Sequence, residues 1–252
     1  MLRFEEIVFG PIHSRRLGSS LGVNLLPAKG KFCNFDCVYC ECGWNRDGVC
    51  DHVLPRLEDV RAAMQTKLES CLEEGMRIDS ITFSGNGEPT LNPDFAEIID
   101  VTLELRDRYY PDAKVSVLTN ATRLFRESVR TALMKVDNPI LKLDAPTTEL
   151  AHRINHPQGE YDVEQVVRDM KLFNGDFVLQ TMFLRSDDFD SSSPEVLNGW
   201  MDIVRELHPR EVMVYTIARP TPQSGLHKFT EAEMRMLVQP LIDEGITIKI
   251  YE

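Results

Sequence analysis

The sequence lacks the segments that would place a chain in or across a membrane. No run approaches the roughly 18–20 consecutive apolar residues that a transmembrane helix needs, although hydrophobic residues make up 42% of the 252 residues. The N-terminal segment MLRFEEIVFG has no signal-peptide pattern of charge, apolar run and small-residue cleavage site. We therefore expect a cytoplasmic protein with no membrane partner.

The sequence is also short of positive charge. Its formal net charge is −12. This balance disfavours a nucleic-acid polyanion as the main partner, because phosphate binding relies on clustered Lys and Arg. Internal repeats and low-complexity segments are absent as well. A length of 252 residues fits one domain over residues 1–252, since α/β barrels often run this long as a single unit.

Strand-like and helix-like segments alternate along the chain. Apolar, β-branched runs predict strands at residues 21–26, 79–83, 114–118, 140–143, 177–182, 212–216 and 246–250. Amphipathic stretches predict helices at residues 57–74, 93–108, 124–136, 163–173, 194–207 and 230–243. This alternation predicts right-handed βαβ units and a parallel sheet. Six such units plus a seventh strand fit a partial barrel better than a closed eightfold one, and a doubly wound open sheet is the alternative.

Ligands of parallel α/β folds bind at the carboxyl ends of the strands. In this sequence unusual polar and glycine residues follow those ends, strand by strand. In chain order they are a cysteine cluster after the first strand, then residues 84–90, Thr119 with Asn120, Asp144, Gln180 with Met182, and Tyr215 with Arg219. We expect these residues to gather on one rim.

All six cysteines lie in the first third of the chain: Cys33, Cys37, Cys40, Cys42, Cys50 and Cys71. Clustering of this kind in a cytosolic chain indicates metal or redox chemistry and not disulfides. Cys33, Cys37 and Cys40 read C-x3-C-x2-C, and three thiolates at this spacing can hold three irons of a cubane. The open fourth iron could take the amino and carboxylate groups of S-adenosylmethionine (SAM), so that one electron breaks a carbon–sulfur bond of its sulfonium.

Other interpretations of the cysteines stay open. A structural zinc site could recruit Cys42 as its fourth thiolate, although the single residue between Cys40 and Cys42 makes a tetrahedron awkward. We interpret Cys42, Cys50 and Cys71 as structural or incidental. The alternative is that Cys42 and Cys50 serve a second cluster or a redox step.

The cysteine motif, with the aromatic Tyr39 before its last member, resembles the signature of the radical SAM superfamily. Residues 85–89, GNGEP, resemble the GGEP motif of that superfamily with Asn86 inserted between the glycines. The flanking residues 10–18 and 20–24 resemble a bacterial and archaeal group of radical SAM proteins that is described as related to the tRNA wyosine-base synthases. These specific residues all lie before about Thr90, whereas the alternating pattern covers nearly the whole chain.

The resemblance implies an α/β fold, a partial (β/α)6 TIM-like barrel with an additional C-terminal strand. It implies a 4Fe–4S cluster on the three cysteines of the motif, with S-adenosyl-L-methionine as the second cofactor. The main chain around Tyr39 would meet the adenine, and Gly87 and Glu88 match the segment that receives the amino group of SAM. Asn120 and Asp144 stand where polar residues contact the ribose or the carboxylate.

The residue chemistry of the GNGEP segment agrees with this role. The carboxylate of Glu88 can accept from an ammonium, and the glycines beside it allow a close approach of the backbone. The alternative for this segment alone is a plain strand-to-helix turn, with Asn92 as the cap before Pro93.

Four basic residues precede the cysteine motif closely in the sequence. We interpret Arg15 and Arg16, with Lys29 and Lys31, as a basic collar that steers an acidic electron donor, a flavodoxin or ferredoxin. The alternative is that Arg15 or Arg16 forms a buried structural ion pair.

Several functions remain in competition. The first is a radical SAM enzyme that abstracts hydrogen from an unidentified small molecule. The second is a tRNA-base modifier of the wyosine type, against which stand the net charge of −12 and the absence of any cysteine before Cys33. The third is an activase that installs a glycyl radical in a partner enzyme. The fourth is a non-catalytic iron–sulfur or zinc module, which the Gly87–Glu88 motif disfavours.

Overall fold

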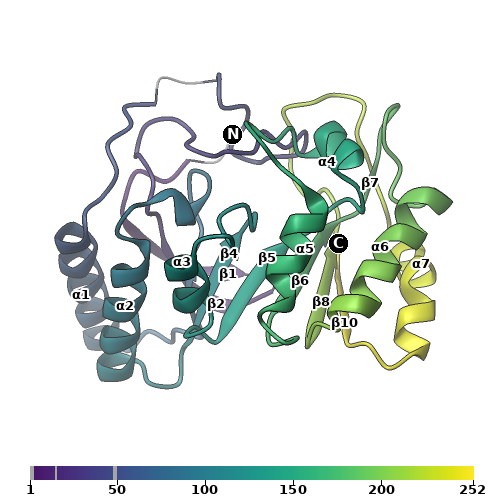
Figure 1. Cartoon of the computed structure of the whole chain (residues 1–252). Coiled ribbons are helices and arrows are strands. Elements are labelled where there is room, and N and C mark those ends of the chain that lie inside the picture. Colours follow the sequence, from purple (N-terminus) through teal and green to yellow (C-terminus); the bar gives the residue numbers. More distant parts are fainter. Residues whose placement is uncertain (1–2, 15, 48–49) are drawn as a thin grey trace.

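The computed structural model describes residues 3–14, 16–47 and 50–252. One eight-stranded sheet runs through it in the order β1-β2-β3-β4-β5-β6-β8-β10 (Figure 1). Its strands are β1 (Val8–Ser14), β2 (Gly18–Val23), β3 (Ser80–Phe83), β4 (Lys114–Thr119), β5 (Asn138–Lys142), β6 (Val178–Met182), β8 (Glu211–Tyr215) and β10 (Ile248–Tyr251). Neighbours from β2 to β10 are parallel, and β1 is antiparallel to β2.

Helices connect the parallel strands. They are α1 (Leu57–Glu73), α2 (Phe95–Tyr109), α3 (Glu127–Leu133), α4 (Thr148–Ile154), α5 (Val163–Lys171), α6 (Pro194–Leu207) and α7 (Glu231–Asp243), with a short 3-10 helix η1 (Pro89–Leu91). Two short strands, β7 (Leu184–Arg185) and β9 (His227–Lys228), pair separately as an antiparallel ribbon. The predicted six strand–helix units and the extra C-terminal strand are confirmed by this element order.

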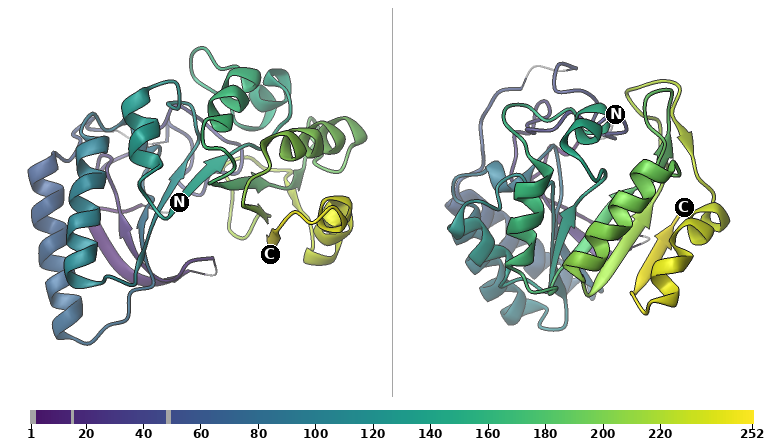
Figure 2. Two further views of the ribbon diagram at one scale, coloured as in Figure 1. Left: turned by 60° about the horizontal axis from the view of Figure 1, so that its bottom comes forward. Right: turned by 45° about the vertical axis from the view of Figure 1, so that its right-hand side comes forward.

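The two faces of the sheet carry different side chains, because successive residues of a strand point to opposite faces. On the face toward the helices, Phe83 of β3 packs edge-on against Phe95 of α2, with ring centroids 6.4 Å apart. On the other face, the hydroxyls of Ser20 and Thr82 are 2.8 Å apart across β2 and β3. Figure 2 shows the sheet curled with the helices on its outer side, so the structure is the partial barrel and not the doubly wound alternative.

The hairpin of β1 and β2 reaches into the concave side of this half-barrel. Leu17, just before β2, packs against Ile140, Val178 and Met213, which belong to β5, β6 and β8. Those strands lie three or more positions away from β2 in the sheet. Curling of the sheet therefore brings the hairpin end against strands of the far half.

Some predicted boundaries were wrong. The first predicted strand, 21–26, begins earlier and ends at Val23, and the antiparallel β1 was not predicted at all. Helix α4 was missed as well, and the third predicted helix is shorter than expected. Asn92 does not cap α2, because Asp94 holds that position and the amide of Asn92 donates to the carbonyls of Leu25 and Pro55 at 3.0 and 2.9 Å.

Across residues 3–14, 16–47 and 50–252, no helix combines the length and the apolar character needed to cross a membrane.

Candidate active site

The cysteine loop lies between β2 and α1 at the carboxyl rim of the half-barrel and is held from two sides. Phe32 bridges to Gly87: its N–H donates to the carbonyl of Asn86 at 2.8 Å, and its carbonyl accepts from the N–H of Glu88 at 3.2 Å. On the other side, the N–H groups of Asp36 and Val38 donate to carbonyls at the end of α4 at 2.9 and 3.0 Å. The predicted cysteine and glycine motifs are therefore brought together.

Two of the three motif thiols receive hydrogen bonds from nitrogen donors. The N–H of Phe35 lies 3.4 Å from Sγ of Cys33, and the amide of Asn155 lies 3.4 Å from Sγ of Cys37. The amide of Asn120 also approaches Cys33, with its nitrogen 3.8 Å from the sulfur. Hydrogen bonds to the sulfurs are one of the means by which proteins tune iron–sulfur clusters.

The environment sets the pKa values of these thiols in opposite directions. Burial raises the pKa of Cys33 above its usual range and that of Cys37 to about 11. A hydrogen bond from the Cys42 thiol lowers the pKa of Cys40 below its usual range, against the effect of burial. Because iron binds the thiolate, loading of this loop must release the protons that the buried thiols hold.

Lys31 lies beneath the cysteine loop, and the predicted basic collar is wrong in this respect. The side chain is 1% exposed and its Nζ donates to Oδ1 of Asp36 at 2.9 Å and to the carbonyl of Gly43 at 3.0 Å. Burial would lower the pKa of Lys31, but the charges of the Cys40 and Cys33 thiolates and the hydrogen bond to the Asp36 carboxylate outweigh burial and hold the pKa above its usual range. A buried ammonium cannot steer a partner protein from solution.

The two other collar residues that the structure describes, Lys29 and Arg16, point to different surroundings. Lys29 is exposed, Arg15 lies outside the described residues, and Arg16 points into the concave side, with its Cζ 5.2 Å from the ring centroid of Tyr215.

The cysteine loop fits an iron–sulfur cluster by its donor set: three thiols on one loop, two of them backed by N–H donors, with a buried ammonium beside them. Among the described residues, no three His, Cys, Asp or Glu side chains converge as ligands of a single metal ion. Of the other cysteines, Cys42 lies 3.5 Å from the carbonyl of Gly85, and Cys71 is buried in α1.

Glu88 is buried at the junction of β3 and β4. Its Oε1 accepts from the N–H and hydroxyl of Thr90 at 3.1 and 2.6 Å and from the hydroxyl of Thr119 at 2.6 Å. Its Oε2 accepts from the N–H of Asn120 at 2.7 Å. Burial raises the pKa of Glu88, although the four hydrogen bonds to its carboxylate act in the opposite direction. A carboxylate oxygen accepts two hydrogen bonds readily, so Oε2 retains capacity for one more donor.

Asn86, the residue inserted into the glycine motif, is a structural clamp. Its amide nitrogen donates to the carbonyls of Phe4 at 2.7 Å and Pro27 at 2.9 Å, and its Oδ1 accepts from the N–H of Phe4 at 3.0 Å. The insertion therefore joins the rim to the segment that precedes β1 and to the loop that follows β2.

Asp144 lies at the centre of a buried network at the carboxyl end of β5. Its Oδ1 accepts from the N–H of Met182 at 2.9 Å, and its Oδ2 accepts from the amide of Asn155 at 2.7 Å and from the hydroxyl of Tyr39. Lys142 completes the network with its Nζ 3.6 Å from Oδ2 of Asp144. Burial raises the pKa of Tyr39, and the Asp144 carboxylate raises it further, so the phenol stays protonated and donates.

Three residues of this region were not predicted from the sequence: Lys142, Asn155 and Arg123. Asn155 links two sites, because its amide reaches both the Cys37 sulfur and the Asp144 carboxylate. Arg123 follows β4, and its Nε is buried without a partner among the described residues. A lysine inside a buried strand pattern was the one sequence signal available for Lys142.

Comparisons with known proteins identify the family and support the fold. The sequence model of the Radical SAM superfamily matches residues 29–191. The UPF0026 protein MJ1312 of Methanocaldococcus jannaschii is 30% identical over 219 residues, which are 85% of this chain and 64% of that protein. The chain therefore spans slightly less than two thirds of the length of this relative.

Solved structures share the fold at low sequence identity. Streptococcus suis SuiB bound to S-adenosylmethionine matches with a TM-score of 0.64 and 18% identity, over 91% of this chain and 50% of that one. A radical SAM methyltransferase from Sphaerobacter thermophilus matches with a TM-score of 0.67 and 16% identity, over 92% of this chain and 66% of that one. Both likenesses support the partial barrel.

Proposed function

The chain belongs to the radical SAM superfamily, and from this premise we propose that it binds a 4Fe–4S cluster and S-adenosyl-L-methionine. In this proposal it cleaves SAM reductively to a 5′-deoxyadenosyl radical, which abstracts hydrogen from a small-molecule substrate. The cluster, when bound, supplies the electron for that cleavage. The protein binds, orients and shields the reacting groups.

One observation carries the proposal: the main chains of Phe32 and Gly87 are paired. This pairing fixes the loop of Cys33, Cys37 and Cys40 against the glycine-rich segment that ends at Glu88. A ligand that bound the open side of a cluster on this loop would therefore lie beside Gly87. The acceptor capacity left on Glu88 suits an ammonium group there.

Other contacts to SAM follow from the same arrangement. We assign the main chain at Tyr39 to the adenine, and Asn120 and Asp144 to the ribose or carboxylate end. Asp144 already accepts three hydrogen bonds from the chain, so its first effect is to position Tyr39 and Asn155. Arg123 suits the SAM carboxylate, because its half-buried side chain has a buried Nε without a partner among the described residues and feels the charge of Glu88.

The test of the proposal is anaerobic reconstitution with iron and sulfide, followed by dithionite and SAM, with 5′-deoxyadenosine measured by chromatography. Single Cys→Ser substitutions at Cys33, Cys37 and Cys40 should each abolish both cluster retention and 5′-deoxyadenosine formation. Cys71→Ser is the matched control, because Cys71 is buried in α1 on the helix side of the sheet. Full 5′-deoxyadenosine formation by any of the three motif variants would contradict the proposal.

A flavodoxin or ferredoxin is the electron donor that we propose for the reaction. With Lys31 buried, the collar offers Lys29 as an exposed cation. Exchange of Lys29 for Glu should slow reduction by a flavodoxin but not by dithionite, because dithionite needs no docking surface. Equal slowing with both reductants would instead indicate damage to the cluster.

A further inference from the structure

The concave side of the half-barrel presents hydrogen-bond donors that the cofactors assigned above do not use. We infer that Arg16, Lys142 and Gln180 form a binding site for an anionic group, a carboxylate or a phosphate, of the substrate. This inference rests on the proposed function, because it places the substrate in the half-barrel below the cluster loop. It adds the chemical class of the ligand, which nothing in the cysteine and glycine motifs specifies.

Lys142 provides the deepest cation. It lies at the end of β5 with its side chain 16% exposed, between the rings of Tyr39 and Tyr215. Its Nζ is 2.8 Å from the hydroxyl of Tyr39 and 2.9 Å from that of Tyr215. Burial would lower the pKa of Lys142, but the Asp144 carboxylate and then Tyr215 outweigh burial and hold the pKa above its usual range.

Gln180 provides a buried donor without a partner. It faces Lys142 in the register of β5 and β6, and Met213 in the register of β6 and β8. Its neighbour Thr181 bonds to Trp200 on the helix side, so alternation turns Gln180 to the concave side. Gln180 is 4% exposed, and its Nε2 has no hydrogen-bond partner among the described residues. A buried N–H donor without an acceptor destabilises the fold, and a ligand that accepts its hydrogen bond would remove that cost.

Arg16 reaches the same place from the β1–β2 hairpin. Its guanidinium lies against the ring of Tyr215, whose hydroxyl bonds to Lys142, so two cations flank one phenol. The carboxylates of the concave side are already engaged: Asp144 lies beside Lys142, and Glu211 pairs with Lys249 at 2.8 Å. Within the described residues no carboxylate lies within 4.0 Å of Arg16, so one positive charge is left over.

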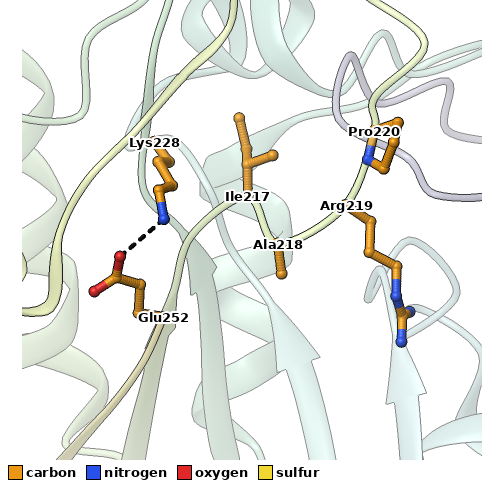
Figure 3. A pocket seen from close by; sticks show the side chains of 6 residues that line it. All are labelled: Ile217, Ala218, Arg219, Pro220, Lys228 and Glu252. Carbon is orange, nitrogen blue, oxygen red and sulfur yellow. Dashed lines mark hydrogen bonds and ion pairs between the residues drawn. The ribbon is translucent and has the colours of Figure 1, made fainter.

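A pocket of about 690 Å³ lies just beyond the end of β8, and Figure 3 shows the side chains that line it. Its wall, Ile217 to Pro220, begins two residues beyond Tyr215. Lys228 and Glu252 pair across it at 2.9 Å, and Arg219 pairs with Glu41 of the cysteine loop. The volume is in the range of about 300–1,000 Å³ that small-molecule pockets occupy.

Equilibrium dialysis of the cluster-loaded full chain tests this site, with radiolabelled inorganic phosphate and radiolabelled acetate as separate probes at fixed ionic strength. We expect one equivalent of one probe to be retained, and the probe that binds tells a phosphate site from a carboxylate site. Arg16→Gln should weaken retention at least about tenfold, as expected for the loss of a charge-assisted hydrogen bond of about 1.5–3 kcal/mol. Arg61→Gln is the matched control, because Arg61 pairs with Glu104 on the outer helices.

Lys142→Met provides a second variant, and iron content and circular dichroism show whether each variant is folded and loaded. Three outcomes would overturn the inference: retention of neither probe by the unmodified chain, equal retention by the Arg16 and Arg61 variants, or complete displacement of the probe by SAM, which would assign the donors to the cofactor. These outcomes concern anion binding alone. Failure of the proposed function would show separately, as absence of the cluster or of 5′-deoxyadenosine.

Discussion

Gly87 lies so close to Phe32 that no side chain fits between them. A Cβ built on Gly87 would lie 1.9 Å from the carbonyl oxygen of Phe32, and the φ angle of Gly87 is +145°. Such a φ is available to glycine and costs other residues strain. The close approach is what allows the glycine-rich segment and the cysteine loop to pair.

Exchange of Gly87 for Ala should therefore separate the two motifs. We expect a loss of stability of about 3 kcal/mol or more, from backbone strain together with a main-chain clash, and loss of the cluster. Iron content after reconstitution and urea unfolding measure the two effects. Gly159→Ala is the control, because Gly159 has a φ of +88° but a Cβ there meets nothing within 4 Å. Equal losses in the two variants would contradict the role of the Phe32 contact.

Exchange of Lys31 for Met should destabilise the chain by about 3 kcal/mol, because it leaves Asp36 as a largely buried carboxylate without its partner. Urea unfolding of the cluster-free chain measures the change. Lys29→Met, at an exposed lysine two positions away, should stay within about 0.5 kcal/mol of the unmodified chain. The double variant Lys31→Met with Asp36→Asn should recover part of the loss, and a further loss in that variant would argue against the ion pair.

Exchange of Asn86 for Ala should cost about 2–4 kcal/mol, because it leaves the main-chain groups of Phe4 and Pro27 without their partner in a part-buried place. Amide hydrogen exchange should rise in residues 3–8 and near Pro27 while the helices stay protected. Asn198→Ala is the control, since Asn198 is exposed on α6. Unchanged exchange near Phe4 would show that the clamp does not hold that segment.

The pH dependence of stability should contain a contribution from Asp137. Burial alone would raise its pKa, but the N–H of Val115 and the guanidinium of Arg106, at 2.9 and 2.8 Å, outweigh burial and hold the pKa below its usual range. The stabilisation is therefore present above the unfolded pKa of about 3.9 and is lost as the pH falls through the lower folded pKa.

Asp137→Asn should lower the free energy of unfolding by about 1–3 kcal/mol at neutral pH, and the difference from the unmodified chain should shrink below about pH 4. Chemical unfolding at a series of pH values measures both. Asp112→Asn removes the same charge from an exposed position before β4 and should show no such trend. A difference that grows on acidification would show that folding raises the pKa of Asp137 instead of lowering it.

The repeating part of the fold could be read from the sequence, because its strands and helices are long and periodic. Helices α1 and α6 begin where they were predicted, since amphipathic periodicity and Pro194 mark them clearly. Strand β1 escaped prediction because Gly10 and Pro11 interrupt its pattern, and its register shifts between Phe9 and Ile12. Helix α4 escaped because its seven residues are too few for periodicity to emerge.

The candidate site likewise contains residues that the sequence analysis named and residues that it missed. The rim residues could be named because each follows a strand end, and the sequence motifs singled out Gly87 and the cysteines. Of the concave donors, Gln180 was named as a residue at the end of its strand, whereas Lys142 was missed. Alternation shows that these two register partners share a face but not which face of the sheet is concave. Nor does a sequence show that Lys31 is buried, because lysines are almost never buried without a specific partner.

The two faces of the sheet differ in what they contact, and this difference has a consequence for protein redesign. Helix packing depends on one set of alternate strand residues, while Ser80, Thr82 and Ser116 form a hydrogen-bonded hydroxyl patch of the other set. Substitution of that second set would change the shape and polarity of the concave face and would leave the packing of the helices on the other face unchanged. A mutant library confined to the residues of the concave face could therefore be screened for binding of new substrates.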